Sequence, residues 1–152
     1  MYDALLEELV DLHRRNGWEL LQPPVTEQRV DILRRRALTE LELVLPDPYA
    51  AFLRRTDGLD FNGLCVYASD RLPIVGHRDR FIPGFVDANL DWRGNIESLG
   101  AQIVFAHDGM TNFVYNHKTG GWEIRWMPSD DLGETVESFD HLLLRALEDH
   151  RP

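Results

Sequence analysis

Residues 45–58 read LPDPYAAFLRRTDG, and this stretch contains the residue types that begin, pack and end a short helix. Asp47 can accept backbone N–H bonds as the N-cap, and Pro48 suits the first helical position because its missing N–H would be unpaired there. Gly58 stands where a left-handed residue closes a helix without steric cost. One helical face carries the residues at i, i+3, i+4 and i+7, namely Tyr49, Phe52, Leu53 and Thr56. We therefore expect a helix that stops sharply and leads into a strand.

Two further helices are predicted before this stretch. Residues 3–16 place one leucine stripe on a helix, made of Leu5, Leu6, Leu9 and Leu12. After an extended connector at 18–25, Thr26 caps a helix whose buried stripe is Val30, Leu33, Ala37, Leu38 and Leu41. Arg34, Arg35 and Arg36 lie mostly off this stripe. These arginines could contact a partner or nucleic acid, but a solvent-exposed helical face with ion pairs to nearby acidic residues is the favoured explanation.

Strands are predicted at β-branched and aromatic runs, which are Leu64–Tyr67, Leu72–Val75, Ile103–Ala106, Phe113–Asn116 and Trp122–Trp126. Pro73 marks an edge position, and Gly120-Gly121 suits the hairpin turn between the last two runs. In the last run, Trp122 and Ile124 share one face with Trp126, opposite Glu123 and Arg125. The wholly apolar run at 103–106 indicates a central strand.

The C-terminal part is predicted to be a linker followed by a helix. The linker contains Pro128 and Gly133, and Ser138 caps a helix whose stripe is Phe139, Leu142, Leu143, Ala146 and Leu147. Helices, then antiparallel strands, then a helix predict an α+β fold. We expect one domain over residues 1–152, with N-terminal helices, a central mainly antiparallel sheet, and a C-terminal helix packed on the sheet.

Gly76–Gly100 is the least patterned part of the chain. We expect a long, partly ordered excursion there, with a short strand around Phe85. Loops of this length inside compact domains are often functional, so the excursion is the expected place of binding. Trp92 lies in this stretch and does not belong to any apolar stripe. Its side chain could therefore lie either at an interface with a partner or in the core.

Three pieces of the chain resemble the SUKH superfamily, the Smi/Knr-type family that includes many bacterial immunity proteins. The family signature is Leu-Pro-x-x-Tyr-x-x-Phe-Leu-x-x-x-Asn-Gly, and the matching residues are Leu45, Pro46, Tyr49, Phe52, Leu53 and Gly58. Asp57 stands where the family has Asn. IVFAHDGMTNFVYNHKTGGWEIR at 103–125 and ESFDHLLLRAL at 137–147 are similar to the closing part of the YrhA-like branch. The resemblance spans roughly residues 26–148 and matches poorly between Arg71 and Gly100.

Composition indicates a globular, cytoplasmic protein. The 152 residues are 43% hydrophobic and 28% charged, which is typical of a folded domain with an ordinary core. No apolar run is long enough to span a membrane, and the opening MYDALLEELVDLHRR is acidic and amphipathic, unlike a signal peptide. The single Cys65 excludes an intramolecular disulfide framework.

The net charge of −10 is unevenly distributed. Residues 1–58 hold 8 basic and 11 acidic side chains, a balance of −3, whereas residues 59–152 hold 8 and 15, a balance of −7. This negative charge argues against nucleic acid as a partner and favours a protein with a basic surface. Solubility alone is the other explanation for the acidity.

Few residues point to catalysis or metal binding. Cys65 lies within LCVY, where a strand buries it as a small hydrophobic residue. The pairs His77–Asp79 and His107–Asp108 could contribute metal ligands, but neither has a matching second cluster. His107-Asp108-Gly109 is better explained as a turn. We therefore predict no catalytic residue, no metal site, no cofactor and no enzymatic activity.

The resemblance implies an immunity protein that binds and neutralises a bacterial protein toxin by occlusion. Acidic loops and an aromatic anchor would meet a basic toxin surface. The predicted contacts are Asp60, Asp79, Asp87, Asp91, Trp92, Asp130 and Asp131. The alternative is an intracellular regulatory or scaffold module of the same superfamily. A small enzyme centred on the two His–Asp pairs is a third, less favoured class.

Overall fold

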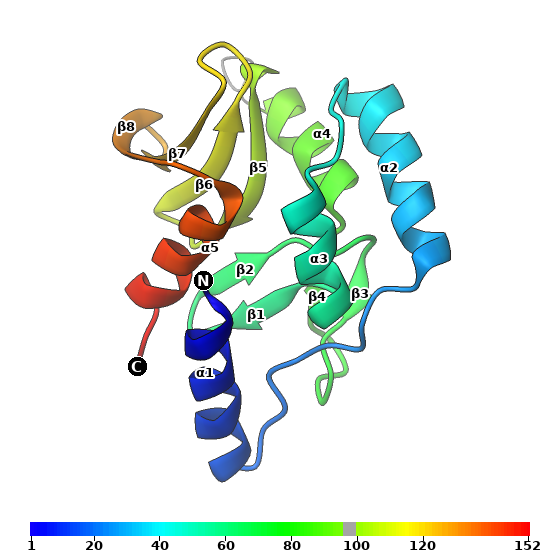
Figure 1. The fold of residues 1–152 in the computed structure, drawn as a ribbon, viewed down its shortest axis with the longest axis vertical. Helices are drawn as coiled ribbons and strands as arrows, with labels where there is room; N and C mark the ends of the chain where they lie inside the picture. The colour runs from blue at the N-terminus through cyan, green and yellow to red at the C-terminus, as the bar shows by residue number, and fades with distance from the viewer. Residues whose placement is uncertain (96–99) are drawn as a thin grey trace.

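The chain forms a six-stranded antiparallel sheet with helices around it (Figure 1). The computed structural model describes residues 1–95 and 100–152. The helices are α1 (Asp3–Arg15), α2 (Glu27–Leu41), α3 (Asp47–Arg55), α4 (Phe85–Asn95) and α5 (Phe139–Asp149). The large sheet has the order β1-β2-β5-β6-β7-β8, from β1 (Leu59–Phe61), β2 (Leu64–Val66), β5 (Gln102–His107), β6 (Thr111–Asn116), β7 (Gly121–Trp126) and β8 (Asp131–Val136). A separate ribbon pairs β3 (Leu72–Pro73) with β4 (Phe81–Ile82).

The predicted α+β class and the order of its layers are confirmed. Helix α5 packs on β6 and β7, and α1 and α3 both contact α5. Helix α4 lies between α2 and strand β5, and α2 and β8 occupy opposite sides of the molecule in Figure 1. Among the described residues, no helix is both long enough and apolar enough to span a membrane.

Helix α3 starts one residue earlier than the sequence predicts. The N–H groups of Tyr49 and Ala50 both donate to the carbonyl of Pro46, at 3.1 and 3.2 Å, so the first turn closes on Pro46 and Asp47 is already helical. The prediction that Asp47 is the N-cap is therefore wrong. Its carboxylate lies 3.4 Å from the Arg34 guanidinium.

Gly58 is required at the junction between α3 and β1. It has a φ of +84°, which favours glycine, although the helix itself already ends at Arg55. A Cβ at this position would lie 2.9 Å from Ile82 Cγ2 and 3.1 Å from the carbonyl oxygen of Val66. Space and backbone conformation thus both exclude a side chain where the helix leads into the sheet.

Tyr49 lies at the centre of one continuous core. It is fully buried, and its hydroxyl donates to the carbonyl of Tyr67 at 2.8 Å. Its ring is 5.0 Å from those of Phe85 and Phe105 and 5.7 Å from that of Phe139, centroid to centroid. These contacts join α3, α4, β5 and α5, which explains why this stretch decides the fold.

The caps of α2 and α5 agree with the predictions. The hydroxyl of Thr26 accepts from the N–H of Arg29 at 3.2 Å, and that of Ser138 accepts from the N–H of His141 at 3.2 Å. All five predicted stripe residues of α5 are buried. In α2, however, Leu38 is 58% exposed because it lies roughly a quarter turn away from the middle of the buried stripe.

The excursion prediction for Gly76–Gly100 is wrong. Residues 85–95 form helix α4, the strand described within this stretch is β4 at Phe81–Ile82, and residues 96–99 lie outside the described part of the chain. The helix has no apolar stripe to reveal it, since its buried positions include Asn89 while Leu90 is 38% exposed.

The linker prediction around Pro128–Gly133 is wrong in its second half, because β8 begins at Asp131. Residues 131–135 are all exposed, so this edge strand shows no alternation of apolar and polar residues. A side chain at Gly133 would also meet the Trp126 indole, since its Cβ would lie 2.8 Å from Nε1. Gly133 therefore belongs to a strand that lies against a tryptophan.

Candidate partner-binding site

A groove of about 520 Å³ runs along the outer side of helix α4. Four segments form it: α4 itself, the chain around β4, the end of β5, and the segment between β2 and β3. The side chains that matter most in its lining are Arg71, Phe81, Asp87, Asp91, Trp92 and His107. The structure thus brings Asp87, Asp91 and Trp92, which the sequence predicts as contacts, into one place. We call it the α4 groove.

The entry into α4 is held tightly by backbone contacts. The N–H of Ala68 donates to the carbonyl of Pro83 at 3.0 Å, and the N–H of Phe85 donates to that of Ala68 at 2.8 Å. A Cβ on Gly84 would lie 2.9 Å from Asp70 Cα, so only glycine lets the two segments approach this closely. The first turn of α4 therefore has a fixed position against the chain that follows β2.

Asn89 clamps the middle of α4 to strand β5. Its Nδ2 donates to the carbonyl of Val104 at 2.8 Å, and its Oδ1 accepts from the N–H of Val104 at 2.7 Å. Nδ2 also donates to the carbonyl of Phe85 at 2.9 Å. The ladder between β5 and β6 is irregular between Val104 and Ala106, and Asn89 supplies partners at that point. This clamp fixes the helix so that Asp91 and Trp92 face the groove.

Trp92, Tyr67 and His107 form a hydrogen-bonded chain behind the groove. The indole Nε1 of Trp92 donates to the Tyr67 hydroxyl at 2.8 Å, and that hydroxyl lies 2.7 Å from His107 Nδ1. Burial raises the pKa of Tyr67 and lowers the pKa of His107, so both side chains are favoured in their neutral forms. Trp92 is therefore a half-buried side chain held at its polar edge, with part of its ring in the groove.

The two carboxylates of the groove differ in whether they already have an ion-pair partner. Asp87 is exposed, but it accepts from Arg36 at 2.8 Å, and Arg36 also binds Glu40 at 2.7 Å. Of the arginine triplet, Arg36 and Arg34 thus have the ion pairs that the sequence favours, whereas Arg35 donates to the carbonyl of Asp31 at 3.5 Å. Asp91 is exposed and has no hydrogen bond or ion pair within residues 1–95 and 100–152. Arg71 lies 3.8 Å from the centre of the Phe81 ring, a cation–π arrangement.

The remaining predicted contacts lie elsewhere. Asp60 pairs with Arg80 at 2.7 Å and lines a second hollow together with Trp18 and His77. Asp79 is exposed in the segment between β3 and β4. Asp131 is exposed at the start of β8. The structure therefore does not bring these residues together with the α4 groove.

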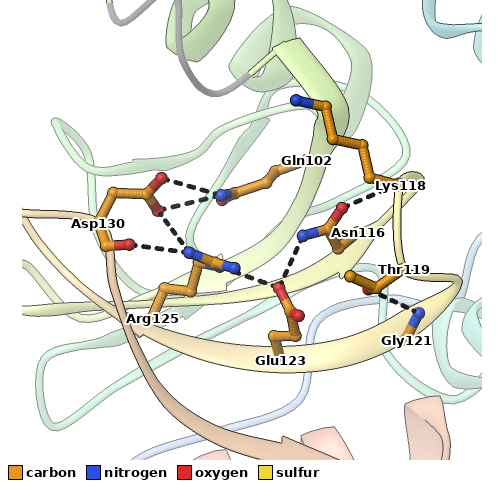
Figure 2. Close-up of polar contacts among 8 residues, drawn as sticks. All are labelled: Gln102, Asn116, Lys118, Thr119, Gly121, Glu123, Arg125 and Asp130. Carbon is orange, nitrogen blue, oxygen red and sulfur yellow. Dashed lines mark hydrogen bonds and ion pairs between the residues drawn. The ribbon is translucent and has the colours of Figure 1, made fainter.

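Asp130 takes part in a polar network across the sheet (Figure 2). Gln102 Nε2 donates to its two carboxylate oxygens at 3.0 and 3.1 Å, and Arg125 donates to its carbonyl at 2.8 Å. Arg125 also donates to Glu123, which accepts from Asn116 at 3.0 Å. The network fastens the segment before β8 to β5, β6 and β7. Asp130 thus has a structural role that its sequence context did not reveal.

In residues 1–95 and 100–152, the His and Asp of the two pairs, His77–Asp79 and His107–Asp108, are not joined by a hydrogen bond or an ion pair. His107 is turned to Tyr67, whereas the carboxylate of Asp108 lies 3.0 Å from His150 Nε2. The ring of His77 stacks on that of Trp18 at 5.9 Å. Across residues 1–95 and 100–152, no three His, Cys, Asp or Glu side chains gather closely enough to hold a metal ion. Cys65 is buried in β2, and burial raises the pKa of its thiol to about 12.

Tyr67 and Arg71 are site residues that sequence reasoning missed. The sequence places His107 in a turn, in a metal pair or in the less favoured enzyme hypothesis, and not in a partner-binding site. Tyr67 and His107 become neighbours of α4 because Cys65 pairs with His107 across β2 and β5, a register that no local pattern reveals. Arg71 comes near because the chain after β2 is bridged to Gly84 at Ala68. No family model matches this sequence, and no curated protein matches it.

Proposed function

We propose that this chain is a SUKH-type immunity protein of the YrhA-like branch, which binds a cognate bacterial toxin and blocks it without chemistry of its own. The signature around Tyr49 and the two later pieces support this assignment. We further propose that it acts in the cytoplasm, with a protein as its partner and without nucleic acid, membrane, metal or cofactor. The net charge of −10 is consistent with a toxin that has a basic surface.

The single observation that carries the proposal is the composition of the α4 groove. It combines an exposed carboxylate, Asp91, with the ring of Trp92 and the exposed ring of Phe81. Carboxylates steer a basic partner and aromatic side chains form the energetic centre of many interfaces. Because Asn89 and the Trp92–Tyr67 bond hold Asp91 and Trp92 in place on α4, binding would cost little ordering of this part of the groove.

The direct experiment is co-expression with the catalytic domain of the toxin encoded beside this gene. Cells that also make this chain should survive, and the two proteins should purify together. If the toxin still kills and no complex is recovered, the immunity function is wrong. The regulatory or scaffold alternative would then predict complexes with proteins encoded elsewhere.

Charge reversal localises the binding surface. Asp91→Lys should raise the Kd for an inactivated toxin domain about 10- to 100-fold, because it places a cation in the groove against a basic surface. Asp79→Lys is the matched control, since it makes the same change in net charge at an exposed residue outside the groove. Isothermal titration of both variants provides the comparison. Equal weakening by the two substitutions would contradict the groove as the contact surface.

A further inference from the structure

The hydrogen-bonded chain behind the groove determines which nitrogen of His107 carries the proton. The indole N–H of Trp92 can only donate, so the oxygen of Tyr67 must accept at the 2.8 Å contact. The proton of the Tyr67 hydroxyl then needs an acceptor of its own. Tyr67 is 1% exposed, and in the described part of the chain His107 Nδ1, at 2.7 Å, is the acceptor within reach.

The opposite tautomer is disfavoured by the same contacts. If His107 carried its proton on Nδ1, both that group and the Trp92 indole would donate to the Tyr67 oxygen. The Tyr67 proton would then be a buried donor without a partner, which is unfavourable. His107 therefore accepts at Nδ1 and keeps its proton on Nε2, and it lines the groove as a neutral hydrogen-bond donor.

The surroundings of this donor select the kind of acceptor. Asp87, Asp91 and Arg71 all line the groove, and Asp87 is already paired with Arg36, so charges of both signs lie there. A neutral N–H donor is matched by a neutral carbonyl oxygen, because a charged acceptor would also have to lose its hydration. The rings of Phe81 and Trp92 offer flat apolar surface to the chain on either side of it.

We propose that His107 donates from Nε2 to a carbonyl oxygen of the bound partner, either a peptide carbonyl or a side-chain amide, and so acts as a specificity-determining residue of the α4 groove. The inference rests on the proposed function for the identity of the partner. Its chemistry is tested without any toxin.

The first measurement is the tautomer itself. Long-range ¹H–¹⁵N correlation spectra of the isolated protein near neutral pH distinguish a protonated Nε2 from a protonated Nδ1. Wild type should show protonation at Nε2, and Tyr67→Phe should show a mixture because Nδ1 has lost its donor. A wild-type ring protonated at Nδ1 overturns the proposal.

The second measurement uses a random 12-residue peptide library displayed on phage. Peptides selected on wild type should bind His107→Leu about fivefold more weakly or worse, the size expected for one lost hydrogen bond. They should bind His107→Gln nearly as well as wild type, because the glutamine amide restores an N–H at a similar place. Melting temperatures of the two variants show whether either is unfolded.

Each outcome of the selection bears on the proposal. Equal binding to wild type and His107→Leu, or a library that yields no peptide sensitive to this change, overturns it. Replacing Asn and Gln in the selected peptides separates a side-chain amide from a peptide carbonyl. If the co-expression test fails while the tautomer and peptide tests give the expected results, the immunity function is wrong but the hydrogen-bonding role of His107 in the groove still holds.

Discussion

Asp57 is a buried carboxylate at the position where the SUKH signature, which this stretch resembles, has Asn. It is 1% exposed, and its oxygens accept from the N–H and hydroxyl of Ser69 at 2.7 and 2.8 Å, with Arg29 at 3.8 Å. Burial outweighs these partners and raises the pKa of Asp57. In this structure the side chain therefore does more than turn the chain, because it ties the α3–β1 junction to the segment after β2.

The raised pKa of Asp57 predicts a pH-dependent effect of Asp57→Asn. A carboxyl whose pKa is higher in the folded state stabilises the fold fully below its ordinary pKa, and this contribution is lost as pH rises through the folded value. The variant does not titrate at this site. Its stability relative to wild type should therefore increase between about pH 3.5 and pH 7, as measured by urea unfolding at several pH values.

Asp47→Asn is the control for this prediction, since Asp47 is an exposed carboxyl on the neighbouring helix. Subtracting the free energy of unfolding of wild type from that of each variant at the same pH removes the effects of the other acidic groups, which all three proteins share. A trend of the same size in both variants would show that burial of Asp57 is not the cause.

At the scale of elements, helix α4 depends on Asn89. Asn89→Ala removes both partners of the Val104 backbone groups and leaves a buried N–H and C=O unpaired. We expect a loss of about 2–4 kcal/mol in the free energy of unfolding. Hydrogen exchange should rise first in α4 and at Val104.

Asp91→Ala provides the comparison on the same helix, because Asp91 is exposed and makes no described hydrogen bond. It should change stability by no more than about 0.5 kcal/mol. If Asn89→Ala were equally mild, the clamp would not be what positions the helix.

The elements that sequence predicted and those it missed differ in how they are stabilised. Helices α2, α3 and α5 bury regular apolar stripes, and α2 and α5 have side-chain caps, so local pattern identifies them. Helix α4 is held by Asn89 and by the contacts of Gly84, and β8 by its pairing with β7, so neither has a local signal. For the site, local sequence suggested Asp87, Asp91 and Trp92, but Tyr67 and His107 join them only through the β2–β5 register.

For the molecule as a whole, charge should govern how fast a partner arrives. With a net charge of −10, association with a basic protein should slow at least about tenfold between 0.05 and 0.5 M NaCl, while dissociation changes little. Stopped-flow fluorescence of the complex with the proposed toxin partner measures both rates. An association rate that does not respond to salt would contradict electrostatic steering.

Asp79→Lys combined with Asp131→Lys is the control for this salt dependence. The two reversals move the net charge from −10 to −6 at exposed residues outside the groove. The salt dependence of association should become shallower, whereas the dissociation rate should stay the same because the contacts in the groove are intact.

The clamp made by Asn89 also bears on how such a protein could acquire new partners. The helix is fastened to β5 by the inward-facing amide of Asn89, whereas Asp91 makes no hydrogen bond or ion pair among residues 1–95 and 100–152. Asp91 could therefore be exchanged for other residues while the backbone of α4 stays where it is. Asp87 differs, because its ion pair with Arg36 also joins α4 to α2. Retargeting, in evolution or in the laboratory, would then require changes on one exposed helical face and none in the core.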